Sequence, residues 1–219
     1  MNKKVFVIII SIILILMIAA CAYASEELET EYFFGGDVWI RASIDELANT
    51  ATDVIRAEVI NSRVERVNTL LAELDSSIDM ERFYVIHTIY ELKVLETFKG
   101  DTQVGDIIEI MQRGGRLGNR ELIYDRKLQI VSGDDAIFFL RSFEEQGFGH
   151  LPMAIEGGFQ GAFRVSSLDT DVMNELSESI ANAYRDNIAL SDLVLESYDP
   201  NNALTLTIGD LMRISDIEQ

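Results

Sequence analysis

The chain of 219 residues contains 37 acidic and 18 basic residues, which gives a formal net charge of −19 at pH 7. Nucleic acids and anionic lipid surfaces attract basic proteins, so this charge argues against both as partners. With one cysteine, Cys21, and two histidines, His87 and His150, the chain can form no internal disulfide and offers few ligands for a zinc site. We predict no cofactor and no metal.

Residues 1–24 have the organisation of a secretory signal peptide. A basic start precedes the almost entirely apolar Val5–Ala20, and Ala22-Tyr23-Ala24 is typical of a signal peptidase site. The overlapping segment Ile18-Ala19-Ala20-Cys21 is similar to a bacterial lipobox, in which the cysteine is acylated and becomes the new N-terminus. The two cleavages exclude each other, and the lipobox predicts lipidation of Cys21.

A third alternative is that the segment is never cleaved, because Val5–Ser25 is long enough to span a bilayer of about 30 Å. We expect the protein to be extracytoplasmic and attached to the outer face of the cell membrane by a lipid or a signal anchor. The alternative is a secreted protein. Glutamate-rich residues 25–42 are predicted to form an acidic spacer.

Residues 43–168 are predicted to form a β-barrel domain that begins with a short helix. Ser43 and Glu46 have the spacing of a capping box. One face of that helix carries Ile44, Leu47, Ala48 and Ala51. Apolar and polar residues then alternate in Val54–Ile60, as in a half-buried strand.

A second strand is predicted for Phe83–Phe98, which is long enough that it should be bent or bulged. Its inward face is expected to carry Tyr84, Ile86, Tyr90, Leu92 and Val94, and its polar face His87, Glu91 and Lys93. Further strands are predicted at Ile107–Gln112, Ala136–Ser142, Pro152–Ile155 and Phe159–Val165. The pair Gly157-Gly158 predicts a tight turn, because no phosphate-loop lysine follows it.

The connection between the first two strands is longer than a hairpin needs. The positions Val64, Val67, Leu70, Leu71 and Leu74 have the spacing of one side of a helix. Long insertions in β domains are frequently functional, so we expect Val67, Leu70, Leu71 and Leu74 to bind a partner protein, with Leu70 or Leu71 accessible. The alternative is that this helix closes one end of the barrel as core.

Residues 169–219 are predicted to form a helical C-terminal segment. One helical face would carry Val172, Met173, Leu176, Ile180, Ala183 and Tyr184. Thr207 and Asp210 have the spacing to cap a final helix that carries Leu211 and Ile214. The predicted fold class is therefore mainly β with helical additions, an OB-like barrel followed by C-terminal helices.

Two segments, residues 51–59 (ATDVIRAEV) and 90–100 (YELKVLETFKG), resemble the netrin-like domain of tissue inhibitors of metalloproteinases. The resemblance extends loosely to Gly133–Arg141, and it implies an OB-fold barrel. In those inhibitors a free N-terminal cysteine chelates the protease zinc, and disulfides hold that end in place. Here the only cysteine would be acylated or removed, so that inhibitory mechanism is not carried over. The strand pattern also resembles uncharacterised extracytoplasmic proteins of Gram-positive bacteria.

The chain lacks the motifs of common nucleophilic enzymes. No G-x-S-x-G pentapeptide occurs, and His87 and His150 are each expected to be surface residues. We therefore expect a non-enzymatic binding or interaction module and assign no catalytic residue. The alternatives are a cell-wall hydrolase that uses unidentified carboxylates, and a regulator or inhibitor of secreted proteases.

Overall fold

The structure is a computed structural model that describes residues 28–34, 40–69, 84–165 and 194–217. This part of the chain is mainly β, as predicted, with two α-helices. At its centre lies a ring of five strands: β2 (Asp53–Asn68), β3 (Tyr84–Lys99), β4 (Ile107–Arg113), β7 (Asp135–Arg141) and β8 (Met153–Ile155). None of the helices described is long and apolar enough to cross a bilayer.

The ring closes because its last strand pairs on both sides. β2 pairs antiparallel with β3 and β7, and β3 pairs antiparallel with β4. β8 then runs parallel to β4 and antiparallel to β7. The order β7-β2-β3-β4 is that of a Greek key, in which the fourth strand returns beside the first.

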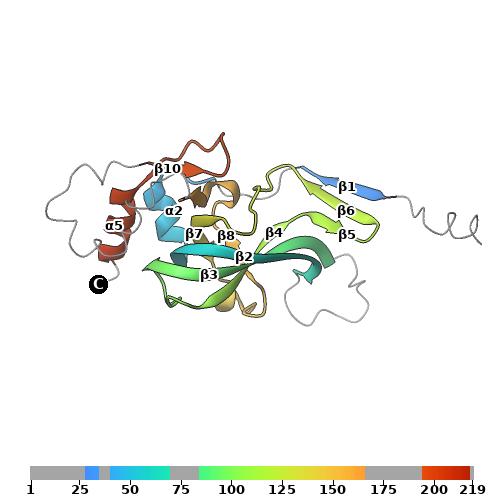
Figure 1. The fold of residues 1–219 in the computed structure, drawn as a ribbon, viewed down its shortest axis with the longest axis horizontal. Coiled ribbons are helices and arrows are strands. Elements are labelled where there is room, and N and C mark those ends of the chain that lie inside the picture. The colour runs from blue at the N-terminus through green and yellow to red at the C-terminus, as the bar shows by residue number, and fades with distance from the viewer. Residues whose placement is uncertain (1–27, 35–39, 70–83, 166–193, 218–219) are drawn as a thin grey trace, which may run out of the picture.

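The two longest strands bend, as predicted from their length. β2 and β3 each contain 16 residues, and the register between them shifts at three places near one end of the pair. Such irregularities increase the local twist and let a long strand belong to two sides of a closed sheet. The far end of the β2–β3 pair extends beyond the ring as a two-stranded arm, which Figure 1 shows at the right of the ring.

The interior of the ring is the first hydrophobic core. It contains Ile55, Ala57 and Val59 of β2 and Tyr90, Leu92 and Val94 of β3, so the inward position predicted for these residues is confirmed. Tyr84, which was predicted to face inward as well, is 40% exposed. β7 contributes Ala136, Phe138 and Leu140. Its alternate residues Ile137 and Phe139 are buried as well, on the outside of the ring. A strand that is buried on both faces has a continuous run of apolar residues, and residues 136–140 of β7 (Ala-Ile-Phe-Phe-Leu) are such a run.

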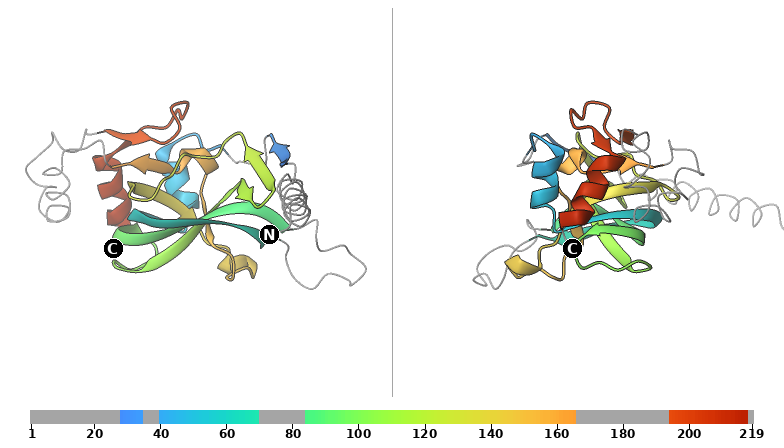
Figure 2. Two further views of the ribbon diagram at one scale, coloured as in Figure 1. Left: turned by 45° about the vertical axis from the view of Figure 1, so that its right-hand side comes forward. Right: turned by 90° about the vertical axis from the view of Figure 1, so that its left-hand side faces the viewer.

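A second core covers the outer face of β2 and β7. Here the sheet continues through β9 (Ala162–Arg164), β10 (Val194–Ser197) and β11 (Leu206–Thr207). The helices α2 (Ile44–Thr50) and α5 (Ile208–Ile217) lie side by side against this core (Figure 2), where Leu47 and Leu211 are buried with Phe139 and Phe163. α5 therefore packs on this core. The sequence predicted α5 as part of a C-terminal segment that follows the barrel domain.

Both predicted helix caps are present. Ser43 Oγ accepts a hydrogen bond from Glu46 N, and Glu46 Oε2 accepts one from Ala42 N. Thr207 Oγ1 accepts from Asp210 N, while Asp210 Oδ2 accepts from Thr207 N. Each pair satisfies backbone donors at a helix start that would otherwise have no partner.

We expect Ser43→Ala to lower the free energy of unfolding by about 1 kcal/mol, because it removes the side-chain acceptor at the start of α2. Urea denaturation followed by circular dichroism measures this change. Ser43→Asp, which keeps an acceptor, should retain most of the wild-type stability. An equal loss for the two variants would show that the missing side-chain acceptor is not the cause of the loss.

A small three-stranded sheet packs beside the ring. Its strands are β1 (Glu29–Phe33), β6 (Arg120–Tyr124) and β5 (Gly115–Leu117), in the order β1-β6-β5. β1 runs parallel to β6, and Leu122 on the inward side of the sheet is buried. No strand was predicted at these positions, and β1 lies within the stretch expected to be an acidic spacer.

Four further expectations need correction. Residues 64–68 belong to strand β2 and pair with Tyr84–Thr88, so the helix predicted from Val64 does not begin there. His87 is buried, at 5% exposure, because both faces of β3 are covered at this point. Residues 158–160 form a short 3₁₀ helix (η3, Gly158–Gln160) ahead of β9 rather than one strand from Phe159. The C-terminal segment contributes β10 and β11 to the sheet, whereas the helix predicted from Val172 lies outside the described residues.

Candidate functional site

An open cleft of about 590 Å³ lies between two loops at one side of the ring. One loop is the turn between β3 and β4, and the other joins β7 to β8 and includes the short 3₁₀ helix η2 (Glu144–Gln146). The start of β2 and the outer part of β4 also line it. Three segments that are distant in the sequence therefore meet here.

The first wall is held by a buried aspartate. Asp53 Oδ1 accepts hydrogen bonds from Thr102 Oγ1 at 2.6 Å and Thr102 N at 3.3 Å, while Thr52 Oγ1 donates to Asp53 Oδ2 at 2.9 Å. Gly100 has φ +95°, and a Cβ there would lie 2.5 Å from Asp53 Oδ1. The turn predicted from Lys99-Gly100-Asp101 thus requires glycine and is fixed to the start of β2.

The second wall is anchored at two points. Ser142 N donates to Thr52 Oγ1 at 2.9 Å, which ties the start of the loop to the first wall. Phe148 is buried, and its backbone N donates to Phe143 O at 3.0 Å. Between these anchors Glu144 and Glu145 are exposed. The loop therefore presents two carboxylates from a fixed backbone.

The cleft is strongly acidic. Its lining includes Asp53, Asp101, Asp106, Glu109, Glu144 and Glu145, and none of the described lining residues is lysine or arginine. Asp106 Oδ2 accepts from Gln103 N, and Glu109 Oε1 lies 2.7 Å from Arg63 Nη1. Asp101, Glu144 and Glu145 are exposed and form no ion pair with a described residue. These three carboxylates give the cleft a negative potential that no ion pair with a described residue offsets.

Part of the cleft lining is apolar. Ile108, Leu151, Pro152 and Met153 contribute to it, and Ile108 and Met153 also pack against the inner core. Acidic and apolar side chains in one cleft suit a ligand that combines positive charge with aliphatic groups, as lysine side chains do. His150 also lines the cleft and is exposed, as predicted.

The arrangement offers little for hydrolysis or metal binding. The oxygens of Asp53, the most buried carboxylate of the cleft, are used to hold Thr52 and Thr102. Among the described residues no three His, Cys, Asp or Glu side chains are placed to hold one metal ion.

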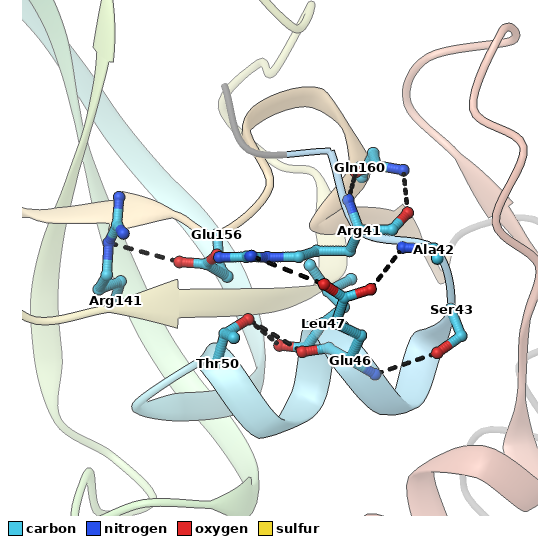
Figure 3. Close-up of polar contacts among 9 residues, drawn as sticks. All are labelled: Arg41, Ala42, Ser43, Glu46, Leu47, Thr50, Arg141, Glu156 and Gln160. Carbon is cyan, nitrogen blue, oxygen red and sulfur yellow. Dashed lines mark hydrogen bonds and ion pairs between the residues drawn. The ribbon is translucent and has the colours of Figure 1, made fainter. Parts of the chain in front are cut away.

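A second polar cluster surrounds Glu156, which is 1% exposed (Figure 3). Arg41 donates to Glu156 Oε1 from Nη2 and, at 3.0 Å, from Nε. Arg141 Nε lies 3.4 Å from Glu156 Oε2. Gln160 exchanges two hydrogen bonds with the backbone of Arg41.

This cluster is a structural clamp. It fixes the segment that leads into α2 against the turn after β8, where Gly157 and Gly158 have φ +63° and +59°. The predicted tight turn is therefore present, and its function is to present Glu156 and Gln160 to Arg41. The clamp lies outside the lining of the cleft.

A threonine and a lysine on the other side of the molecule resemble a nucleophile and its base. Lys127 Nζ donates to Thr88 Oγ1 at 2.6 Å, and burial lowers the pKa of Lys127. Thr88 is buried, however, and its hydroxyl donates to Gly114 O at 2.7 Å. A nucleophile must be reachable by substrate, so this pair is a brace between β3 and the start of the small sheet.

Glu96 lies beside the partly buried ion pair of Arg56 and Asp135. Arg56 binds Asp135 through two hydrogen bonds of 3.0 and 2.7 Å, and Glu96 is the register partner of Arg56 on β3. Burial raises the pKa of Glu96 from 4.5 to about 7, against the opposing effect of Arg56. Between pH 4.5 and about 7, the folded protein therefore retains a proton on Glu96 that the unfolded chain has lost.

It follows that the contribution of Glu96 to stability is present below pH 4.5 and is lost as the pH rises to about 7. We expect Glu96→Gln to raise the free energy of unfolding at pH 8 relative to wild type, with a smaller difference at pH 5. Urea denaturation at the two pH values measures it. A difference independent of pH would contradict the raised pKa.

Of the sequence-predicted site residues, only Val67 lies in the described part of the chain, and it does not line the cleft. Val67 is buried at 8% exposure within β2 and cannot supply an accessible partner surface. Leu70, Leu71, Leu74 and the lipidation residue Cys21 lie outside the described residues. The cleft residues Asp101, Glu144 and Glu145 were not predicted. Only the turn signals around Gly100 and Gly105 marked one of its walls.

Comparison of the chain with models of protein families and with curated proteins gives no match.

Proposed function

We propose that the protein is a non-enzymatic binding module at the outer face of the cell membrane, and that its acidic cleft takes a positively charged ligand, such as a lysine-rich segment of a partner protein. The observation that carries this proposal is a set of three carboxylates, Asp101, Glu144 and Glu145, that form no ion pair with a described residue and share the cleft with apolar side chains. The secretory signal and the lipobox around Cys21 support the location and the tether.

The proposal includes an OB-like barrel. The closed five-stranded ring and its Greek-key strand order support this architecture, which the netrin-like resemblance implies. The two segments that carry the resemblance, residues 51–59 and 90–100, lie mostly in the paired strands β2 and β3. In OB-folds the loop between the fourth and fifth strands commonly contributes to ligand binding. The corresponding connection here, from β7 to β8, forms the second wall of the cleft.

Calorimetric titration of the chain from Ser25 onwards with an octalysine peptide tests the site. The triple variant Asp101→Asn, Glu144→Gln, Glu145→Gln should bind about tenfold more weakly or worse, which corresponds to about 1.4 kcal/mol. A matched control, Glu58→Gln, Glu196→Gln, Asp216→Asn, removes the same charge from exposed positions outside the cleft. Equal weakening in the two triple variants would mean that only net charge matters, and it would refute the site.

A further inference from the structure

The first residues of β4 direct backbone groups away from β3. Val94 N donates to Asp106 O at 2.9 Å, where the pairing of β3 with β4 begins. Hydrogen-bonded residues alternate along an antiparallel pair, so Ile108 is the next residue of β4 whose backbone groups face β3. The backbone N–H groups of Ile107 and Glu109 therefore point to the opposite edge of the strand, as does the carbonyl of Ile107.

On that opposite edge, β8 covers only the later part of β4. β8 runs parallel to β4 and is in register with Ile110 and Met111 alone. The residue that precedes β8 is Pro152, which has no N–H with which to continue the ladder toward the start of β4. The segment Ile107–Glu109 therefore has β3 on one side and no strand on the other, within the part of the chain that the structure describes.

This open edge belongs to the acidic cleft. Asp106, Ile108 and Glu109 line the cleft together with the three carboxylates that form no ion pair with a described residue. Proteins commonly protect an exposed edge with lysine or proline, and Ile107–Glu109 contains neither. The cleft therefore offers backbone donors and an acceptor to a ligand, in addition to its negative charge.

We propose that the lysine-rich ligand binds in extended form, as a strand added to the edge Ile107–Glu109, an inference that rests on the proposed function. In this mode of recognition the main-chain hydrogen bonds supply affinity, and the surroundings of alternate side chains supply specificity. Alternate side chains of a strand lie on one face, about 6–7 Å apart, so lysines at every second position face the same wall of the cleft. The ligand class is an extended cationic peptide, because a polyamine has no peptide groups to pair with the edge.

The first test changes the ligand and leaves the protein intact. The chain from Ser25 onwards is titrated in a calorimeter with octalysine and with octalysine that is methylated on every backbone nitrogen. Methylation keeps the charges and removes the N–H donors, so the methylated peptide should bind about tenfold more weakly or worse. Unmodified octalysine should also protect the amides of Ile107 and Glu109 from hydrogen exchange.

The second test changes one residue of the edge. Ile107→Pro removes an edge N–H that points away from β3, and proline is accepted at the first residue of a strand. Ile107→Ala is the matched control, because it shortens the same exposed side chain and keeps the N–H. Ile107→Pro should weaken octalysine binding about fivefold or more, and Ile107→Ala less than about twofold. Circular dichroism shows whether each variant is folded.

The outcomes separate this inference from the proposed function. Equal affinity for the two peptides, with binding still weakened in the triple variant of Asp101, Glu144 and Glu145, would overturn strand pairing and leave the proposed function standing. Octalysine that does not bind, or that binds the triple variant equally well, would overturn both. Equal weakening by Ile107→Pro and Ile107→Ala would assign the effect to the side chain and overturn strand pairing. If Ile107→Pro does not fold, the comparison of the two peptides decides.

Discussion

Arg41→Ala should lower the free energy of unfolding by about 3–5 kcal/mol, because it leaves a buried carboxylate without its main partner. Glu156 is 1% exposed, and both donors of the Arg41 guanidinium that reach it would be lost. The remaining cation, Arg141, lies 3.4 Å from the other carboxylate oxygen and is itself half-buried. Urea denaturation monitored by circular dichroism measures the loss.

Two controls identify the cause. Arg213 forms an ion pair with Asp45 at the surface, so Arg213→Ala should cost at most about 1 kcal/mol. The double variant Arg41→Met, Glu156→Leu removes both charges and should recover most of the stability lost in Arg41→Ala. A single-variant cost as small as that of Arg213→Ala would show that the clamp does not hold α2 in place.

Leu92→Ala should destabilise the protein by about 2–5 kcal/mol, because it removes a side chain at the centre of the inner core. Leu92 is fully buried and packs within the cluster that includes Ile55, Val59 and Phe138. Thermal or urea unfolding of the purified variant measures this change. A closed ring has no flexible side toward which the core could collapse to fill the cavity.

The neighbouring position is the matched control. Lys93 follows Leu92 on β3 and is exposed, since successive side chains of a strand alternate between its faces. Lys93→Ala should therefore change the free energy of unfolding by no more than about 0.5 kcal/mol. Equal costs at the two positions would contradict the assignment of inner and outer faces along β3.

Local patterns predicted much of the fold. The structure contains the capping boxes at Ser43 and Thr207 and the alternation in β2 and β3. Each of these features depends on residues that are close together in the chain. The apolar run of β7 also predicted a buried strand. These signals depend on short-range periodicity, which sequence reports directly.

The errors arose where pairing decides the structure. Val64 and Val67 have a spacing that fits a helix, yet both are β-branched and pair across to Thr88 and Val85 of β3. The sequence of β1 is typical of a charged spacer, and the segment forms a strand because it pairs with β6. His87 looks polar in a strand pattern, but the chain covers both faces of β3 at that position. Tertiary contacts of this kind override local preference.

The cleft could not be predicted for the same reason. Asp101 and Glu144 are separated by 43 positions, and only the closure of the ring brings their loops together. Acidic residues are so frequent in this chain that none stands out by composition. What distinguishes Asp101, Glu144 and Glu145 is that they line one cleft and form no ion pair with a described residue, a property of the fold.

The most direct test of the binding site is a map of amide chemical shifts by nuclear magnetic resonance. The labelled chain from Ser25 onwards is titrated with the octalysine peptide. Cleft binding predicts that the largest changes fall in residues 100–109 and 142–153, with saturation, and that the triple variant of Asp101, Glu144 and Glu145 abolishes them. Shifts scattered over the acidic surface, or equally large in the triple variant, would contradict the proposal that this cleft is the binding site.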